Sequence, residues 1–246
     1  MHLDGGRQHG FFLTLEGPEG SGKSTQAQRL AARLNASGRH CVVTRDPGGT
    51  ALGEEVRQIL LHAPELAPVP AADALLFNAA RAQLAAELIE PALERGEVVI
   101  CDRFGDSTLA YQGYGAGQPL DALRALMRFA VGDLRPDLTF LIDLPVEDGL
   151  RRKQADEITR FEERADVEFH RRVRDGFLAL AAAEPGRFVV IDGSQTADAI
   201  EAAIFEALLP QLSRHDELTP RNAEYAANAS LPLVSEPERG SLRMEK

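Results

Sequence analysis

Apolar residues form five short continuous runs along the chain, and polar residues fill the stretches between them. Within a run the apolar positions follow one another without alternating with polar ones. This pattern is typical of strands that are buried on both faces, as in a parallel sheet. The predicted strands cover residues 11–15, 41–44, 98–101, 138–144 and 188–191.

The stretches between these runs have the spacing of amphipathic helices. In the first of them Leu30 and Leu34 share one face, and Gly38 follows as a stop signal. A long Ala- and Leu-rich stretch contains Pro91, which should kink its helix or mark a short restart, because proline lacks a backbone N–H. The predicted helices cover residues 23–35, 71–95, 121–131, 146–153, 163–183 and 200–209. Strands that alternate with helices predict a doubly wound α/β domain.

The two ends of the chain depart from this pattern. Residues 213–246 show neither a helical nor a strand period, and polar residues and prolines dominate there. We expect a flexible tail, or else a segment that docks onto a partner. The predicted organisation is a flexible leader over residues 1–10, one domain over residues 11–212, and this tail.

Charge and cysteine content narrow the classes of function. A net charge of −11 argues against a general nucleic-acid-binding protein, which needs a basic surface to displace counterions. A small anionic ligand in a local basic pocket stays possible. No run approaches the roughly 18 consecutive apolar residues of a membrane span, so we expect no membrane partner. Cys41 and Cys101 are isolated thiols within apolar runs, which predicts buried strand residues in a reducing compartment, the cytoplasm.

A phosphate-binding loop follows the first predicted strand. The pattern G-x-x-x-x-G-K-[ST] is matched at every position by Gly17-Pro18-Glu19-Gly20-Ser21-Gly22-Lys23-Ser24. Its glycines let backbone N–H groups point inward at a phosphate, and the helix that follows adds its positive end. Lys23 is expected to reach the β- and γ-phosphates and Ser24 to bind magnesium, with Thr25 nearby. The loop predicts ATP or GTP binding, but no particular reaction.

Polar residues also follow the second and third predicted strands, at the edge where open α/β sheets bind ligands. The second strand leads into a tight Pro-Gly-Gly turn, and Arg57 follows on a predicted helix. The third strand ends in Asp102 and Arg103, which are costly if they face a core. We expect Asp102 to hold magnesium through water and Arg103 to grip a phosphate, unless the two form a structural ion pair.

Two further stretches allow two interpretations each. Phe77 and Arg81 share a helix face, which suits a planar base, but the pair taken alone favours a core ring beside a surface charge. Residues 151–174 hold eight Lys or Arg against six Asp or Glu in an otherwise acidic chain. Such a segment suits a lid that closes over phosphates, or a solvated helix with i,i+4 ion pairs.

Together these segments resemble thymidylate kinases over residues 11–209. The matching pieces are the loop with Glu19 inside it, TRDPGGT, LLFNAAR, DRF-x-x-S-x-x-AYQG and LRPDLTFLIDL. The resemblance implies a P-loop NTPase-type three-layer fold of the nucleoside monophosphate kinase kind. In that fold a five-stranded parallel sheet is flanked by helices and carries a short lid, here at about residues 149–165. It also implies ATP and dTMP as substrates, Mg²⁺ as the metal, and a homodimer formed through helices.

The resemblance assigns roles to the candidate residues. It implies catalytic roles for Lys23, Arg103, Arg152 and Arg160. It implies ATP binding by Gly17, Pro18, Glu19, Gly20, Ser21, Gly22, Lys23, Ser24 and Thr25. It implies dTMP binding by Glu19, Arg57, Phe77, Arg81, Arg103, Ser107, Tyr111 and Gln112, and metal binding by Ser24 and, through water, Asp102.

The loop contains no arginine, which resembles the bacterial type that supplies arginines from the lid. Arg152 and Arg160 are the lid candidates, with Arg151 and Lys153 as competitors, because the lid aligns with a gap. Two other positions depart from the family pattern. Asp46 stands where the family usually has Glu, and Phe104 where it usually has Tyr.

Other functions stay open at this point: another nucleotide kinase, a deoxynucleoside kinase, or a regulatory module without turnover. A nucleoside kinase would need a carboxylate base for a neutral hydroxyl and would leave Arg57 and Arg103 without a shared task. A nucleotide-binding regulatory module would need a loop that reports the γ-phosphate to a partner. An acceptor phosphate has a second pKa near 6, so a nucleotide kinase needs no general base.

Overall fold

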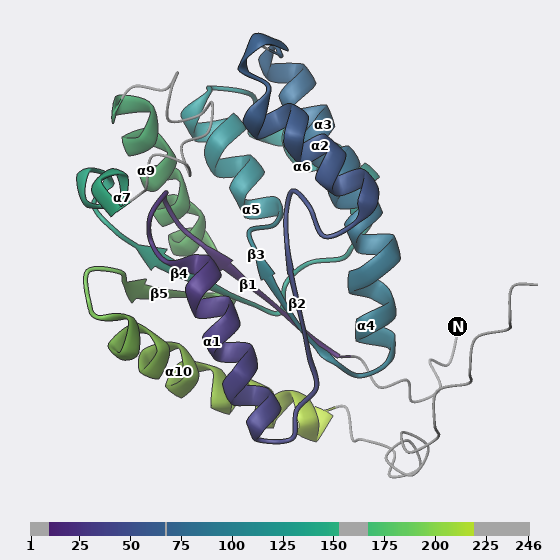
Figure 1. Ribbon diagram of the computed structural model, residues 1–246, viewed down its shortest axis with the longest axis vertical. Helices are drawn as coiled ribbons and strands as arrows, with labels where there is room; N and C mark the ends of the chain where they lie inside the picture. Colours follow the sequence, from purple (N-terminus) through teal and green to yellow (C-terminus); the bar gives the residue numbers. More distant parts are fainter. Residues whose placement is uncertain (1–9, 67, 153–166, 219–246) are drawn as a thin grey trace, which may run out of the picture.

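The computed structural model describes residues 10–66, 68–152 and 167–218, and the structural account is confined to them. They form a parallel sheet of five strands with helices on both faces (Figure 1), in the order β2-β3-β1-β4-β5. The strands are β1 (Phe11–Glu16), β2 (Cys41–Arg45), β3 (Val98–Asp102), β4 (Leu138–Asp143) and β5 (Phe188–Asp192). The predicted α/β fold with a five-stranded parallel sheet is confirmed, because each apolar run became one strand.

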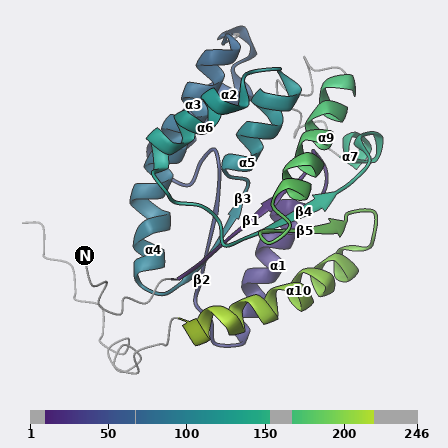
Figure 2. The same ribbon diagram turned by 180° about the vertical axis from the view of Figure 1, so that it is seen from behind.

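Alternate residues of the strands pack into two separate helical layers, which Figures 1 and 2 show from opposite sides. Leu13 and Leu15 of β1 pack with α1 (Lys23–Ala36) and α10 (Ala197–Leu218). Phe12 faces the other layer, where it packs with Leu84 and Leu93. That layer includes α3 (Pro70–Leu84), α4 (Glu90–Glu94) and α9 (Val167–Ala183). Burial on both faces explains the continuous apolar runs.

The remaining helices lie near the carboxyl edge of the sheet or pack on the outside of the layer that contains α3. Helix α2 (Ala51–His62) and α6 (Leu120–Val131) both pack against α3. A short helix, α5 (Gly105–Thr108), continues into a π-helical turn, η3 (Leu109–Gly115). Helix α7 (Val146–Arg152) follows β4, and a 3-10 turn, η1 (Pro64–Leu66), follows α2. No helix in the described parts of the chain has the length and apolar character of a membrane span.

The stretch predicted as helical over residues 71–95 restarts at Pro91, which is one of the two outcomes expected there. Helix α3 ends at Leu84, a π-helical turn, η2 (Ala85–Ile89), follows, and α4 carries Pro91. Proline cannot donate to the carbonyl four residues earlier, and a wider turn just before it accommodates that missing bond.

The last helix is longer than predicted. Helix α10 includes Pro210 and runs to Leu218, past the domain boundary expected at residue 212. Its final turns are held by the His215 ring, which lies edge-on to Phe11 at 5.3 Å, and by a 2.5 Å ion pair between Arg39 and Asp216. The rest of the predicted tail, residues 219–246, lies outside the described residues, as do the leader residues 1–9.

The two cysteines differ in burial. Cys101 on the inner strand β3 is buried, as expected, whereas Cys41 is only half-buried. The expectation was wrong for Cys41 because β2 is an edge strand with one neighbour.

The phosphate loop touches helix α7 backbone to backbone. A Cβ added at Gly20 would lie 2.1 Å from the Gly149 carbonyl oxygen, and one added at Gly149 would lie 2.1 Å from the Glu19 carbonyl oxygen. Both distances are far below contact distance, so only glycine fits on either side. The contact fixes the loop relative to the first turns of α7.

We therefore expect Gly149→Ala to destabilise the fold, although alanine normally favours a helix by about 1 kcal/mol. The methyl group must displace backbone, which costs about 1–3 kcal/mol and lowers the thermal midpoint by several degrees. Differential scanning fluorimetry measures this shift. Gly186→Ala is the matched control, because no atom lies within 4 Å of its added Cβ. An unchanged midpoint for Gly149→Ala would contradict the close contact.

Candidate functional site

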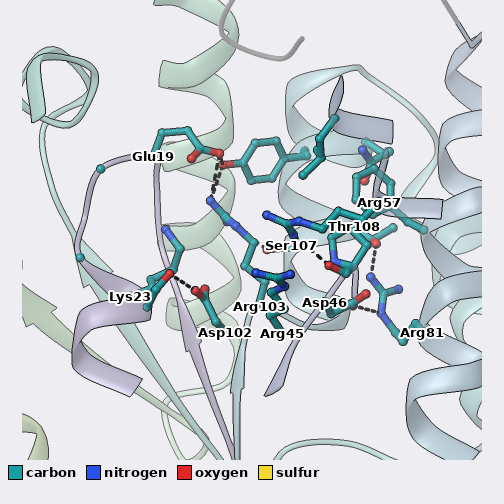
Figure 3. A pocket seen from close by; sticks show the side chains of 18 of the residues that line it. Glu19, Lys23, Arg45, Asp46, Arg57, Arg81, Asp102, Arg103, Ser107 and Thr108 are labelled. Atoms are coloured by element: carbon teal, nitrogen blue, oxygen red, sulfur yellow. Dashed lines mark hydrogen bonds and ion pairs between the residues drawn. The ribbon is translucent and has the colours of Figure 1, made fainter. Parts of the chain in front are cut away.

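The carboxyl ends of the strands and the phosphate loop border a cavity of about 520 Å³ (Figure 3). Its volume lies in the range of small-molecule sites. The predicted site residues that line it are Glu19, Gly20, Gly22, Lys23, Ser24, Thr25, Arg57, Phe77, Arg81, Asp102, Arg103, Ser107, Tyr111, Gln112 and Arg152. Gly17, Pro18 and Ser21 are buried within the loop itself. Residues from six separate segments of sequence therefore meet at one cavity, as parallel strands require.

The loop has the backbone that the motif predicts. Gly17, Gly20 and Gly22 have φ values of 143°, 68° and 91°, in the region that side chains with a Cβ rarely adopt. Helix α1 begins directly after Gly22, so the positive end of its dipole points toward the loop. The turn is thus built to present backbone donors to an anion.

Lys23 lies inside the loop. Its Nζ donates to the carbonyl oxygens of Pro18 at 2.8 Å and Gly17 at 3.2 Å, and to the Ser21 hydroxyl at 3.2 Å. Burial, reinforced by the charge of Arg103, lowers the pKa of Lys23 to about 8. The ammonium is therefore the main form at neutral pH, but it loses its proton more readily than an exposed lysine.

Arg103 is the central cation of the cavity. Its Nη2 donates to Glu19 and to the Tyr111 hydroxyl, both at 3.0 Å, and its Nη1 donates to the Gly17 carbonyl at 3.0 Å and to Ser107 at 3.2 Å. Although burial opposes the charge, the neighbouring phenol and carboxylates raise the pKa of Arg103 further above its usual value. Figure 3 shows the side chain between Glu19 and Asp102.

Ser24 and Asp102 lie side by side at the mouth of the loop. The Ser24 hydroxyl donates to Asp102 Oδ2, which brings the start of α1 to the end of β3. A hydroxyl and a carboxylate are the hard oxygen donors that Mg²⁺ prefers. The two side chains predicted to bind the metal are therefore in contact, and their chemistry fits it.

A second buried guanidinium lies deeper in the cavity. Arg81 and Asp46 are each 1% exposed and form a 2.6 Å ion pair. Arg81 also donates to the Thr108 hydroxyl at 2.8 Å and to the side-chain oxygen of Asn78 at 3.1 Å. Of the two interpretations left open by the sequence, the surface charge is wrong for Arg81. Phe77, one turn earlier on α3, lines the same cavity and is half-buried.

The remaining predicted residues complete the cavity wall. Arg57 on α2 donates to the Pro47 carbonyl at 2.8 Å, and the cost of burial lowers its pKa. The Tyr111 hydroxyl donates to Glu19 at 2.7 Å, and its ring packs edge-on against Phe177. Gln112 is buried at the cavity wall.

The described part of the lid is short. Arg152, at the end of α7, lines the cavity and donates to the Gly193 carbonyl at 3.0 Å. Arg160, Lys153 and the predicted lid beyond residue 152 lie outside the described residues. Arg151 pairs with Asp148 on the exposed side of α7.

Several site residues were missed by the sequence analysis. Thr108 and Asp46 line the cavity and hold Arg81, and Arg45 and His62 also line it. Glu16 lies behind the cavity wall and accepts a hydrogen bond from the Ser107 hydroxyl at 2.6 Å. A signal for Glu16 was present, because a carboxylate that extends an apolar strand buried on both faces must have a polar partner.

A phosphate loop at the carboxyl edge of a parallel sheet, with arginines and a hydroxyl–carboxylate pair facing one cavity, defines the class: a P-loop phosphotransferase that binds nucleotides. The family model described as "Thymidylate kinase" matches residues 15–204. The chain belongs to the thymidylate kinase family.

Individual relatives agree with the family assignment. The thymidylate kinase of Deinococcus radiodurans is 52% identical over 203 residues, covering 81% of this chain and 96% of the relative. That of Geobacter sulfurreducens is 48% identical over 212 residues, covering 83% and 99%. Among solved structures, the thymidylate kinase crystal structure from Ehrlichia chaffeensis is similar with a TM-score of 0.68 and 35% identity, covering 81% of this chain and 98% of that chain.

The lowered pKa of Lys23 predicts a pH dependence of ATP use. We expect kcat/KM for ATP to fall above pH of about 8, because the neutral amine no longer attracts the phosphates. The decline in kcat should occur at higher pH than the decline in kcat/KM, because the polyphosphate of bound ATP stabilises the Lys23 ammonium. Steady-state kinetics at fixed free magnesium measure both profiles. If kcat and kcat/KM fall at the same pH, the titration of Lys23 does not cause the decline.

Proposed function

We propose a division of work among the cavity residues for the reaction of this family. As a thymidylate kinase, the chain is an ATP-dependent phosphotransferase that phosphorylates dTMP to dTDP. The observation that carries the division is the separation of two guanidinium groups: Arg103 at the phosphate loop, and Arg81 buried deeper beside Asp46. An acceptor nucleotide also has two ends, a phosphate and a base, and each guanidinium can bind one of them.

The acceptor phosphate lies between Arg57 and Arg103. Both side chains line the cavity, and both are held by carbonyl oxygens, Pro47 for Arg57 and Gly17 for Arg103. A guanidinium presents a planar fork of donors that suits a phosphate, and a fixed fork loses little freedom on binding. These contacts support a site for the monophosphate of dTMP.

The thymine base stacks on Phe77 and receives a hydrogen bond from Arg81. The Arg81 guanidinium is held by Asp46 and Thr108, so its orientation is set before the base arrives. Gln112 and Ser107 lie at the pyrimidine edge, and Tyr111 lies under the deoxyribose with Glu19 near the 3′-hydroxyl. The hydroxyl proton of Ser107 is already donated to Glu16, so Ser107 faces the base as an acceptor.

The phosphate loop holds ATP through its backbone amides, with Lys23 at the β- and γ-phosphates and Thr25 beside them. Ser24 would hold Mg²⁺ directly and Asp102 would hold it through water, which fits their contact and their oxygen chemistry. When bound, the metal supplies positive charge to the phosphate oxygens.

The transfer itself needs positioning and positive charge. An acceptor phosphate oxygen forms a bond to the γ-phosphorus of ATP while the bond from that phosphorus to the β–γ bridging oxygen breaks, and ADP leaves. The acceptor phosphate is mostly dianionic at neutral pH, so no side chain must remove a proton. Lys23, Arg103 and the lid arginines Arg152 and Arg160 stabilise the charge on the transferred group.

Paired substitutions separate acceptor binding from transfer. Arg57→Ala should raise KM for dTMP about tenfold to a hundredfold with little change in kcat, because it removes a charged phosphate contact. Arg152→Ala or Arg160→Ala should lower kcat more than it raises that KM. A coupled ADP-release assay measures these constants.

The same assay tests the acceptor. We expect the enzyme to phosphorylate dTMP but not thymidine. Arg135→Ala is the control for the arginine variants and should keep wild-type kinetics, because that exposed side chain pairs with Glu184 away from the cavity. Phosphorylation of thymidine would contradict the phosphate site and favour a nucleoside kinase. A kcat within about twofold of wild type for both lid variants would contradict the lid assignment.

We further propose that the chain forms a homodimer through α2, α3 and α6. These neighbouring helices carry exposed apolar side chains: Leu52 on α2 is 49% exposed, Leu75 on α3 is 57% exposed, and Phe129 on α6 is 89% exposed. Ala122 and Ala125 place two more exposed apolar groups on the face of α6 that carries Phe129. Large exposed apolar side chains on adjacent helices favour burial against a second copy.

Phe129→Glu should therefore convert the dimer to a monomer, because it places a charge in the apolar interface. Sedimentation velocity measures the mass of each species. Leu209→Glu on α10 is the matched control, since Leu209 is a 45% exposed leucine on the opposite face of the sheet, and it should leave the dimer intact. A monomeric wild-type chain would contradict the proposal.

A further inference from the structure

Glu16, the last residue of β1, has a fully buried carboxylate that the roles assigned above do not use. Its side chain shares a face with Thr14, because side chains alternate along a strand. Both of its polar contacts come from the segment that follows β3. Phe104 N–H donates to Glu16 Oε1 at 2.8 Å, and the Ser107 hydroxyl donates to Oε2 at 2.6 Å.

Ser107 connects this carboxylate to the central cation. A hydroxyl has one proton to donate and two lone pairs to accept with. The proton goes to Glu16, because a carboxylate only accepts, and Arg103 Nη1 donates to the same Ser107 oxygen at 3.2 Å. A guanidinium cannot accept, so both hydrogen bonds have a fixed direction.

The backbone of this segment also needs support. Arg103 has φ of 70°, the one positive φ outside glycine among the described residues. Side chains with a Cβ rarely adopt that region. On one side the Arg103 N–H donates to the Leu15 carbonyl at 3.0 Å, and on the other Glu16 holds the N–H of Phe104. Consecutive residues of β1 thus hold consecutive amides of the segment that presents Arg103.

We propose that Glu16 is a positioning residue of the acceptor site: as a carboxylate it sets the direction of the Ser107 hydroxyl and holds Arg103 in the orientation that faces the cavity. The proposal rests on the proposed function, which assigns Arg103 to the phosphate of dTMP. Glu16 itself lies behind the cavity wall and touches no substrate.

The charge of Glu16 depends on its surroundings. The titratable or charged groups that act on it or respond to it come from four places: Asp106 on α5, Arg103 after β3, Lys23 on α1 and Cys101 on β3. Burial, and after it the negative charge of Asp106, raises the pKa of Glu16 to about 7. Asp106 accepts hydrogen bonds from both terminal nitrogens of the Arg187 guanidinium, at 2.6 and 2.9 Å.

Protonation of Glu16 reverses the connection. An acid on Oε2 donates to Ser107, and the hydroxyl proton must then turn away from Glu16, toward either Arg103 or the base, so Ser107 loses an acceptor position on that side. We therefore expect dTMP to be held best when Glu16 is ionised, that is, above pH of about 7.

Glu16→Gln tests this step, because glutamine keeps the size and the acceptor for Phe104 but turns an NH₂ group toward Ser107. The ratio of wild-type to variant kcat/KM for dTMP is measured from about pH 5.5 to about 9. Since both enzymes use the same substrate, the titration of the dTMP phosphate cancels in this ratio. The ratio should rise with pH to about tenfold, with its midpoint near pH 7, and the change should lie in KM.

The thermal midpoint separates this role from a structural one. A carboxyl group whose pKa is raised by folding stabilises the fold fully below its unfolded pKa of about 4.5, and that contribution is lost as pH rises through about 7. Relative to wild type, Glu16→Gln should thus become more stable as pH rises, while its activity becomes relatively worse. A variant that merely disrupts packing would not show these opposite trends.

Two further variants complete the test. Asp137→Asn is the control, because Asp137 accepts from the Phe12 N–H at 2.8 Å near the other end of β1. For this variant the ratio of wild-type to variant kcat/KM for dTMP should not change with pH. Ser107→Ala should raise KM for dTMP, and adding Glu16→Gln to it should have no further pH-dependent effect. A flat ratio for Glu16→Gln, or an unchanged KM for Ser107→Ala, would overturn the proposal.

Arg103→Gln distinguishes this failure from a failure of the proposed function. If Arg103→Gln leaves KM for dTMP unchanged, the assignment of Arg103 to the acceptor phosphate is wrong. If it raises that KM while the Glu16→Gln ratio stays flat, Arg103 keeps its role and only the positioning by Glu16 is wrong.

Discussion

Buried guanidinium groups need carboxylates beside them, and this requirement fixes the segments around the sheet relative to one another. Arg81 and Asp46 are each 1% exposed, and Arg187 and Asp106 are nearly as deeply buried. An unpaired charge in such a place costs several kcal/mol, so each pair must form when the fold forms. The partners come from different elements: Asp46 follows β2 and Arg81 lies on α3. Charge pairing therefore fixes how the loops after the strands sit on the helices.

The same pairing lets an acidic protein bind polyanions. The chain carries a net charge of −11, yet its cavity presents Lys23, Arg57, Arg81 and Arg103. Carboxylates behind or beside these cations neutralise part of their charge at a distance, while hydrogen bonds keep their donors directed inward. Fixed donors need no rearrangement as charge moves from ATP to the acceptor, and such preorganisation is a large term in phosphoryl transfer. Affinity for phosphate thus depends on local geometry rather than on net charge.

Much of the fold was predictable because burial on both faces leaves a direct trace in sequence. Each continuous apolar run became a strand of the sheet, and the glycine positions of the loop marked its backbone. The errors arose where tertiary contacts override local pattern. A π-helical turn before Pro91 changes no apolar period, and α10 passes Pro210 because His215 and Asp216 find partners far away in sequence. Neither contact can be inferred from the neighbouring residues.

The candidate site was also predictable only in part. Residues at strand ends could be expected to meet, because parallel strands bring their carboxyl ends to one edge. The residues that hold them could not, since Glu16 lies 91 positions from Ser107 and Asp106 lies 81 from Arg187. Thr14 and Glu16 are polar residues at alternate positions of a strand covered on both faces, a signal that the sequence analysis did not use. A polar side chain there must find a buried partner. Because the carboxyl end of that strand opens into the phosphate loop, the partner of its last residue had to belong to the site itself.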